Sequence, residues 1–283
     1  MEEGIVTIPR GRQVAEPLRI MRRAEAGSGP LTFQTRIVAE PESDVTIIEE
    51  AISESASTAP VASTVELTVG AGARVRYYHL QNWSCGTEHT FTQQATVERD
   101  GQLLSLLVTL GSRTTKASVE TRLVGPGARS DLYGIAFGDQ SQRFEFQTLQ
   151  DHLVPNTASD LLYKTALADH ATSIYTGLIR IAKDAQKTDA YQANRNLLLS
   201  EHAKADSIPM LEILADDVRC THGATVGPVD AEQAFYLTSR GIPFPVAERM
   251  IVEGFFDQVI GKLPLEELRE RLHAHIERKW HRP

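Results

Sequence analysis

Alternation of apolar and polar residues dominates the first three-quarters of the chain, which shows almost no helical period. Every second residue of VELTV at 65–69 is apolar, and the alternation resumes in VRYYH at 75–79. Between the two runs lies GAGAR at 70–74, whose glycines suit a tight turn. This pattern predicts short half-buried strands that are joined by turns.

The same arrangement recurs further along the chain. Further runs of β type lie at 102–110, 118–124, 131–137, 143–149, 172–182 and 195–200. Several strands lead into similar turns, in which two or three glycine or polar residues precede an alanine and another strand. The alanines are Ala73, Ala128, Ala171 and Ala203. Their spacing fits one or two stacked repeat units of roughly 20–30 residues each.

We therefore predict a mainly β fold in which residues 1–228 form a solenoid. A β-sandwich would also explain short strands with turn signals, but the recurrent turn favours stacked coils. The strict hexapeptide period of the left-handed acyltransferase helices does not occur in the sequence.

The pattern changes at residue 229, where helical periods begin. Asp230 and Gln233 resemble a capping box, and the helix that they open would end at Gly241. A second helix after Pro245 carries an apolar stripe of Val246, Met250, Ile251, Phe255 and Val259. A third, after Pro264, carries Leu265, Leu268, Leu272, Ile276 and Trp280. We expect residues 229–283 to form a small helical domain.

Composition removes several classes of function. The net charge of −8 comes without a long Lys/Arg stripe, which argues against a nucleic-acid partner. The N-terminus MEEGIVTIPR lacks the basic and apolar regions of a signal peptide. No apolar run approaches the ~20 residues that span a bilayer. We expect a soluble, cytoplasmic protein with no membrane contact.

Sequence signatures of common enzymes are absent. The chain has no GxxxxGK[ST] phosphate loop, GxSxG elbow or HExxH helix. Its two cysteines, Cys85 and Cys220, are too few for a four-cysteine metal site, and we expect no bridge between them. The chain is therefore not expected to be an enzyme.

The motif CTHGATVG is the strongest candidate for site chemistry, because it contains Cys220 and His222. Residues i and i+2 of a strand point to the same face, so thiol and imidazole could address one ligand. Both donors suit iron in a sulfur environment. Two donors cannot complete an iron site, so the others would come from another chain or from sulfide. The alternative is a buried cysteine that packs beside a hydrogen-bonded histidine.

Other candidates have plainer explanations. Asp216 and Asp217 are typical of a solvated turn. His273 and His275 diverge on a helix, so they indicate an exposed face. The polar run 183–196 suggests either a ladder of amide side chains, a dimer contact or a solvated turn.

Two long stretches carry a resemblance to a known family. AQKTDAYQANRNLLLSEHAKADSIPMLEILADDVRCTHGATVG at 185–227 and AFYLTSRGI at 234–242 resemble the core domain of SufD and SufB, which are iron–sulfur cluster assembly scaffolds. The resemblance implies a right-handed parallel β-helix with a C-terminal helical domain. It also implies that two scaffold chains pair, as a SufB–SufD heterodimer or a homodimer, and that each binds an ABC-type ATPase called SufC.

The motif residues place this chain closer to SufD. Where SufB-type chains resemble EHEATTS, this sequence has CTHGATVG. Ala203 and Thr121 stand where SufB-type chains carry cysteines, which argues against a sulfur-accepting role. His222, with Cys220 beside it, is then the expected contact of a transient nascent cluster at the dimer interface. Longer members carry an N-terminal helical segment that this sequence lacks, so we expect a short version able to pair with itself.

Three classes of function are compatible with the sequence. The first is a scaffold of the SUF machinery, whose ATPase would dock around Phe235, Tyr236, Arg240 and Gly241. The second is a carbohydrate-active lyase or hydrolase, which would need paired carboxylates on one solenoid face. The third is a purely structural interaction protein, in which His222 would have no role.

Overall fold

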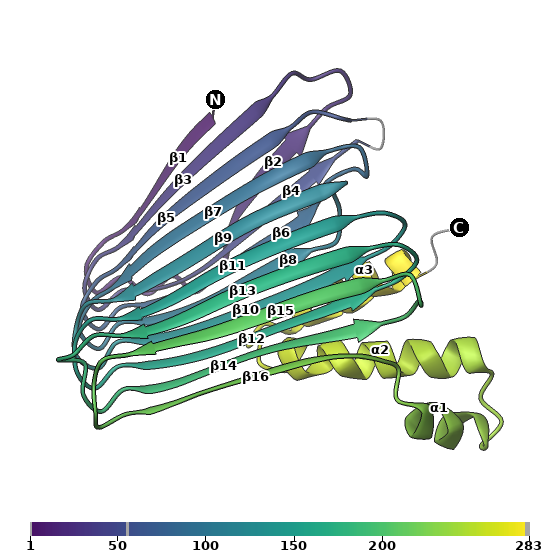
Figure 1. Cartoon of the computed structure of the whole chain (residues 1–283). Helices are drawn as coiled ribbons and strands as arrows, with labels where there is room; N and C mark the ends of the chain where they lie inside the picture. Colours follow the sequence, from purple (N-terminus) through teal and green to yellow (C-terminus); the bar gives the residue numbers. More distant parts are fainter. Residues whose placement is uncertain (1, 55–56, 281–283) are drawn as a thin grey trace.

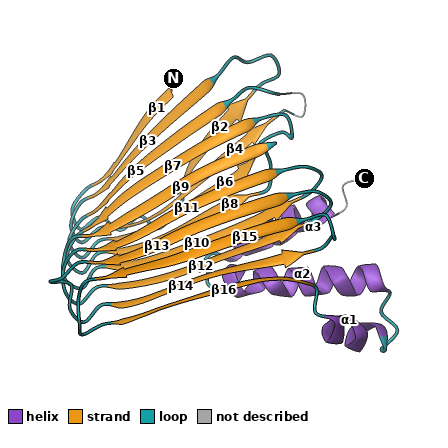
Figure 2. Ribbon diagram, in the orientation of Figure 1, coloured by secondary structure: helices purple, strands orange, loops and turns teal. Residues whose placement is uncertain are grey.

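The computed structural model describes residues 2–54 and 57–280 of the chain. Within these residues, sixteen strands are followed by three helices (Figures 1 and 2). The odd-numbered strands form one parallel sheet and the even-numbered strands another, which we call the odd sheet and the even sheet. The chain passes from one sheet to the other after each strand.

The odd sheet comprises β1 (Glu2–Ile8), β3 (Leu31–Ala39), β5 (Val61–Val69), β7 (Glu88–Val97), β9 (Thr114–Leu123), β11 (Arg143–His152), β13 (Thr172–Ile181) and β15 (Lys204–Ile213). The even sheet comprises β2 (Leu18–Ala24), β4 (Asp44–Ser53), β6 (Arg74–Asn82), β8 (Gln102–Thr109), β10 (Arg129–Gly138), β12 (Ala158–Leu167), β14 (Asp189–Leu198) and β16 (Arg219–Pro228).

Each strand pairs in register with the strand one coil later. Arg129 of β10 lies beside Ala158 of β12, and Ala158 lies beside Asp189 of β14. A coil therefore takes about 30 residues, which is the length of a stacked repeat unit. Consecutive coils pair in parallel throughout, so the predicted solenoid is confirmed and the sandwich alternative is wrong.

The alanine turns fall where the chain leaves one sheet for the other. Ala73, Ala128, Ala171 and Ala203 are all buried, and each donates its backbone N–H to the carbonyl three residues earlier. A small side chain fits there because the turn of each coil stacks on the turn of the next. The repeated turn was therefore a true sign of stacked coils.

Alternate residues of each strand fill the space between the sheets. Large inward side chains such as Tyr77, Phe91 and Tyr175 are fully buried, and so is Trp83, which follows β6. The intervening residues of the odd sheet face outward and are largely exposed. Those of the even sheet are mostly buried or partly buried from β4 to β14, apart from positions near the starts of the strands, which indicates that something covers this sheet.

The covering layer is made by the C-terminal helices. These are α1 (Ala231–Thr238), α2 (Phe244–Ile260) and α3 (Glu266–Trp280). Asp230 caps α1 by accepting from the N–H groups of Glu232 and Gln233, as predicted. Helices α2 and α3 share an apolar core with the outer face of the even sheet, whereas α1 packs on α2 (Figure 1).

The buried face of α2 differs from the predicted stripe. Val252, Phe256, Val259 and Ile260 are buried, while Val246 and Met250 are exposed. The residues that meet the strands lie on a different face from most of the predicted stripe, although Val259 belongs to both. Met250 and Ile251 instead line the groove beside α1, which a helical wheel alone could not show. The predicted core residues Leu268, Leu272 and Ile276 of α3 are buried.

Polar contacts also hold the helices on the solenoid. The ammonium of Lys164 on β12 donates to the carbonyl oxygen of Phe255 in α2 at 2.6 Å. At the N-terminal end of α3, Glu267 pairs with Arg19 of β2 at 2.7 Å. Whether residues 229–283 fold as a domain of their own stays a prediction. None of the described helices has both the length and the apolar content needed to cross a membrane.

Candidate functional site

The predicted site residues lie on the last strand of the even sheet. Cys220 and His222 of β16 pair with Ala190 and Gln192 of β14. Gln192 points into the solenoid, because its amide nitrogen donates to the Gly177 carbonyl of the opposite sheet at 3.3 Å. Cys220 and His222 share its orientation and therefore stand at the open C-terminal end of the interior.

Cys220 is half-buried at this end. It packs against a small apolar cluster that includes Ile181, Ala190 and Ala215. Burial raises the pKa of its thiol to about 11, because the thiolate would lose its hydration there. In the isolated chain Cys220 is therefore a neutral thiol, and a nearby metal or positive charge would be needed to deprotonate it.

His222 is exposed, because β16 is the last of the described strands and no further coil covers it. Within the described residues, no group of three or more His, Cys, Asp or Glu side chains is arranged to hold a metal. Cys220 and His222 thus offer two donors, as the sequence predicted. Any complete metal shell at this position needs ligands from outside the chain.

Amide side chains line the interior beneath the site. Gln192, Asn194 and Asn196 of β14 are all buried and project inward, with Asn196 donating to Asn194 at 2.6 Å. The polar run 183–196 therefore combines two of the expected explanations: residues 183–188 form a turn that is exposed in part, and the β14 portion forms the amide ladder. The ladder is incompletely bonded, since Gln192 Oε1, Asn196 Oδ1 and Ser207 Oγ have no partner among the residues that the structure describes. Unpaired buried acceptors are costly and usually mark a site that water or a partner completes.

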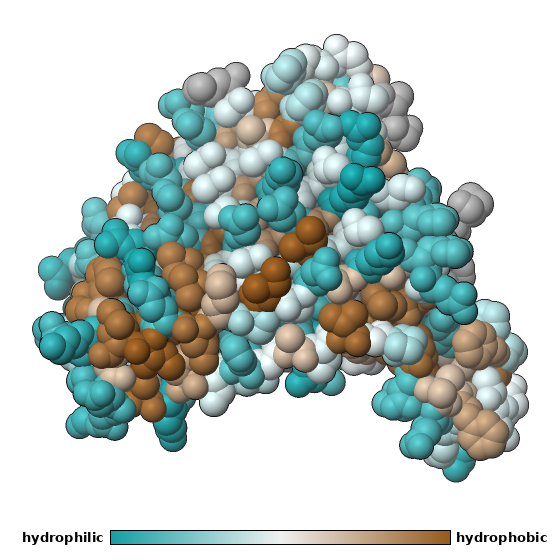
Figure 3. Space-filling model, viewed as in Figure 1, coloured by the Kyte–Doolittle hydropathy of each residue, from teal (hydrophilic) through white to brown (hydrophobic). Residues whose placement is uncertain are grey.

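The strands of the last coil expose apolar side chains. These are Ile208, Met210 and Ile213 on β15, Leu214 just after it, and Val226 on β16. Apolar residues gather on the visible face toward these last coils (Figure 3). Strands β15 and β16 end their sheets, so their outer backbone groups have no strand partner within the described part of the chain. Apolar edge strands are typical of surfaces that pair with another chain.

The residues predicted to bind an ATPase surround α1. Phe235 and Tyr236 are 73% and 56% exposed, and the Arg240 guanidinium stacks 4.6 Å from the Tyr236 ring centre. Gly241 ends this segment with a φ of +86°, a conformation that side chains other than hydrogen disfavour. Beside them, α1, α2 and the end of β16 enclose a groove of ≈1000 Å³ whose walls include Leu237.

Among the described residues, none of the weaker candidates belongs to a group that could hold a metal. His275 was expected on an exposed face but is partly buried, which lowers its pKa. Asp216 and Asp217 are exposed in the turn between β15 and β16. His273 lies 3.4 Å from Asp257 on the neighbouring helix, which is a surface contact. Cys85 is exposed in the turn between β6 and β7, far along the solenoid from Cys220.

Sequence reasoning missed a network of buried charges near the N-terminal end. Arg22 and Glu49 are almost fully buried and pair at 3.0 Å, and Tyr77 donates to Glu49 at 2.7 Å. Tyr77 also lies 3.4 Å from His79, whose pKa burial lowers to about 3. The available signal was Glu49 itself, which stands at an inward position of an otherwise apolar strand.

The positions where SufB-type chains carry cysteines are buried here. Ala203 lies at the turn into β15, and Thr121 faces inward on β9. Neither side chain can accept sulfur, because an alanine methyl and a threonine hydroxyl are not thiols. The described interior of the last coils therefore offers Cys220 as its sulfur nucleophile.

Comparison with known proteins gives consistent results. Residues 22–255 match the family model described as "SUF system FeS cluster assembly, SufBD core domain". An iron–sulfur cluster assembly SufBD family protein of Mycobacterium tuberculosis is 36% identical over 284 residues, covering 96% of this chain and 70% of that protein. The SufD proteins of Bacillus subtilis and Escherichia coli are 34% and 29% identical, again over 96% of this chain. The chain spans 63% and 65% of their lengths.

Proposed function

Because the chain belongs to the SufBD family of the SUF iron–sulfur cluster assembly system, we propose that it is a scaffold component of that machinery. It pairs with itself or with a SufB-type chain and binds a SufC-type ABC ATPase. It holds a nascent cluster transiently and catalyses no reaction alone. The observation that carries this proposal is the unfinished last coil, where apolar edge strands lie beside two metal donors.

Pairing follows from the exposed edges of β15 and β16. A second scaffold chain would satisfy their free backbone groups and bury Ile208, Met210 and Val226. These side chains are about half exposed in the single chain, so burying the rest of each contributes roughly 0.7–1.5 kcal/mol. The same contact would shield the amide ladder from bulk water and offer partners for its unpaired oxygens.

The proposed contact with a nascent iron–sulfur cluster rests on the position of Cys220 and His222. Cys220 and His222 face the open end of the interior, so a second chain at this edge would bring its own ligands opposite them. Iron with sulfide accepts both thiolate and imidazole ligands. The cluster is cargo in this scheme, assembled at the interface and passed on.

The decisive experiment replaces His222 in the complete complex. With His222→Ala we expect normal folding, scaffold pairing and ATPase binding, but a several-fold lower yield of cluster in anaerobic assembly. His202→Ala is the matched control, because His202 is also an exposed histidine but lies in the turn before β15. Wild-type cluster yield from His222→Ala would leave this histidine with a structural role only.

We propose the groove beside α1 as the docking surface for the ATPase. Phe235 and Tyr236 present large exposed aromatic surfaces that a monomer has no reason to keep. Removing the whole helical tail would uncover the even sheet, so point variants are the cleaner test. Phe235→Glu with Tyr236→Glu should abolish ATPase co-purification while scaffold pairing persists. Unchanged ATPase affinity would place the docking site elsewhere.

The carbohydrate-active alternative gains no support from the outer face of the odd sheet. Several of its acids are paired with neighbouring cations, as Glu66 is with Arg36 and Asp151 is with Arg180 at 2.7 Å. A sugar-cleaving site needs carboxylates that are free to exchange protons or attack the sugar.

A further inference from the structure

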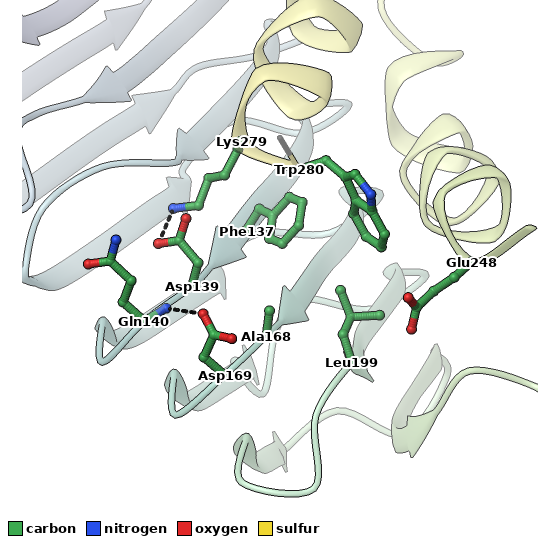
Figure 4. A pocket seen from close by; sticks show the side chains of 9 residues that line it. All are labelled: Phe137, Asp139, Gln140, Ala168, Asp169, Leu199, Glu248, Lys279 and Trp280. Atoms are coloured by element: carbon green, nitrogen blue, oxygen red, sulfur yellow. Dashed lines mark hydrogen bonds and ion pairs between the residues drawn. The ribbon is translucent and has the colours of Figure 1, made fainter. Parts of the chain in front are cut away.

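A pocket of ≈230 Å³ lies where the helical layer meets the coil turns (Figure 4). One wall comes from the turns after β10 and β12, through Asp139 and Asp169. The other comes from Glu248 of α2 and from Lys279 and Trp280 of α3. Pockets for drug-sized ligands begin near ~300 Å³, so this one suits a single side chain or a small ion.

The pocket combines aromatic and acidic walls. Phe137 and Trp280 lie with ring centres 6.2 Å apart and form its inner side. Asp139, Asp169 and Glu248 surround the space beside them, and Figure 4 shows their carboxylates approaching it from two directions. Aromatic faces and carboxylates share one preference, which is for positive charge.

The cation that lines the pocket, Lys279, is already engaged. Its ammonium is buried, lies 3.4 Å from Asp139 Oδ1, and donates to the oxygens of Leu110 and Gln142. Its charge balances that of Asp139. It lies 6.0 Å from the Phe137 ring centre, which leaves the Trp280 indole as the remaining aromatic face.

Two carboxylates of the pocket, those of Asp169 and Glu248, have no cation paired with them among the described residues. Asp169 accepts the backbone N–H of Gln140 at 2.8 Å but pairs with no cation among the described residues. Glu248 is half-buried and has neither an ion pair nor a hydrogen bond within the part of the chain that the structure describes. Burial raises the pKa of Glu248, since its charged form is poorly solvated there.

Asp139 supplies a second, independent indication. Asp139 is only 8% exposed, and neither of its carboxylate oxygens accepts a hydrogen bond from residues 2–54 or 57–280. A buried carboxylate usually accepts several hydrogen bonds, so the Oδ2 atom is left unsatisfied. A donor entering the pocket would complete it.

We infer that this pocket binds an organic cation, a guanidinium or primary ammonium group, between the Trp280 indole and the carboxylates of Asp169 and Glu248. The site is separate from the proposed cluster contact on β16. An organic cation fits better than a magnesium ion, because Mg²⁺ keeps its waters and gains nothing from an aromatic wall. The source is either a free small molecule or a basic side chain of a partner protein.

Occupancy would add a further polar link between the helices and the solenoid, which contacts such as Lys164 with Phe255 and Arg271 with Glu50 already join. The lining residues come from two coil turns, the loop after β14, and both long helices. A bound cation would therefore hold the helical layer on the solenoid, close to where the ATPase is proposed to dock.

The test is a titration of the intact chain with ethylguanidinium, followed by NMR of the indole N–H signals. The chain has two tryptophans, so a Trp280→Phe variant assigns the Trp280 signal. Ethylguanidinium should shift that signal saturably, while the neutral isostere ethylurea should not. Equal shifts from both compounds would overturn the proposal.

Single-residue variants show which carboxylates bind the cation. Glu248→Gln and Asp169→Asn should each weaken ethylguanidinium binding at least tenfold. Glu270→Gln, which removes an exposed carboxylate of α3 outside the pocket, should leave binding unchanged. Unchanged affinity in both pocket variants would overturn the proposal, as would saturable binding of magnesium chloride in place of ethylguanidinium.

A final arm distinguishes the two sources. An acetylated and amidated Gly-Arg-Gly peptide that binds at least as tightly as ethylguanidinium would identify a partner's side chain as the occupant. Binding of ethylguanidinium with exclusion of the peptide would identify a free small molecule.

Discussion

At the N-terminal end of the solenoid, the Arg22 side chain fills the interior and pairs with Glu49, Glu2 and Thr35. At the C-terminal end, the inward positions of β16 hold Cys220 and His222, one half-buried and the other exposed. Both ends terminate the same two sheets. The interior of the solenoid is therefore closed at its N-terminal end and open at its C-terminal end.

The polar groups at the two ends differ in the same sense. The buried charges of Arg22 and Glu49 are matched within one chain. At the other end, Gln192, Asn196 and Ser207 keep oxygens that no described residue pairs with, but neutral groups of the N-terminal coils such as His79 Nε2 and His89 Nδ1 are also without a described partner. The two ends therefore differ in their charged groups and in their exposure, because only the N-terminal end is closed by a matched ion pair.

The largest expected effect comes from breaking the N-terminal seal. Arg22→Ala leaves Glu49 buried without its counter-charge and should lower the free energy of unfolding by about 3–5 kcal/mol. Chemical denaturation measures the loss. Arg36→Ala is the control, because its pair with Glu66 is exposed and should contribute no more than about 1 kcal/mol. Equal losses in the two variants would contradict the sealed-end description.

Thiol reactivity probes the open end. With a pKa of about 11, Cys220 should carry about 100-fold less thiolate near neutral pH than an ordinary thiol with a pKa of 9.0. Its alkylation rate should rise about tenfold per pH unit until the pH approaches 11. A Cys85→Ala variant leaves Cys220 as the sole thiol for the measurement. Alkylation as fast as in the denatured chain would show that Cys220 is not shielded.

Pairing affinity distinguishes the two ends directly. Ile208→Asp places a charge on the exposed C-terminal edge and should raise the dissociation constant of scaffold pairing at least tenfold, the equivalent of about 1.4 kcal/mol. Ile5→Asp makes the same change on β1, where Ile5 is 71% exposed at the sealed end, and should leave pairing unchanged. Analytical ultracentrifugation gives both constants. Equal weakening would place an interface at each end.

The smallest expected effect tests the incomplete amide ladder. Gln192→Met removes an unpaired oxygen and should change the free energy of unfolding by about 1 kcal/mol or less. Gln81→Met is the matched control, because Gln81 is bonded to Gly111 and Ser112 and its loss leaves buried groups unpaired. That variant should lose about 1–3 kcal/mol. A greater loss for Gln192→Met would show that its bonds are complete.

The sequence predicted features that repeat or depend on local pattern. The alternation in 65–69 and the four turn alanines were enough to predict stacked coils, because every coil applies the same rule. Asp230 predicted the start of α1 through its capping chemistry. The motif around His222 predicted two donors on one strand face, and β16 has them there.

Features that depend on which surfaces meet were not predictable. The buried face of α2 depends on contact with the even sheet and with α1, so Val246 and Met250 were placed on the wrong side. The Arg22–Glu49 pair joins residues from neighbouring coils, and their pairing appears only in the register of β2 and β4. The pocket between Asp169 and Glu248 combines turns and helices that lie far apart in sequence.

Helix α3 has a consequence for the order of events during synthesis. Its Arg271 and Glu267 pair with Glu50 and Arg19, which leave the ribosome more than two hundred residues earlier. At about 5–20 residues per second, the 221 residues that separate Glu50 from Arg271 take roughly 10–45 s to synthesise. During that time the apolar outer face of the even sheet, including Ile48 and Leu106, has no cover from its own chain. The nascent protein thus depends on α3, which is made much later, to cover its first coils.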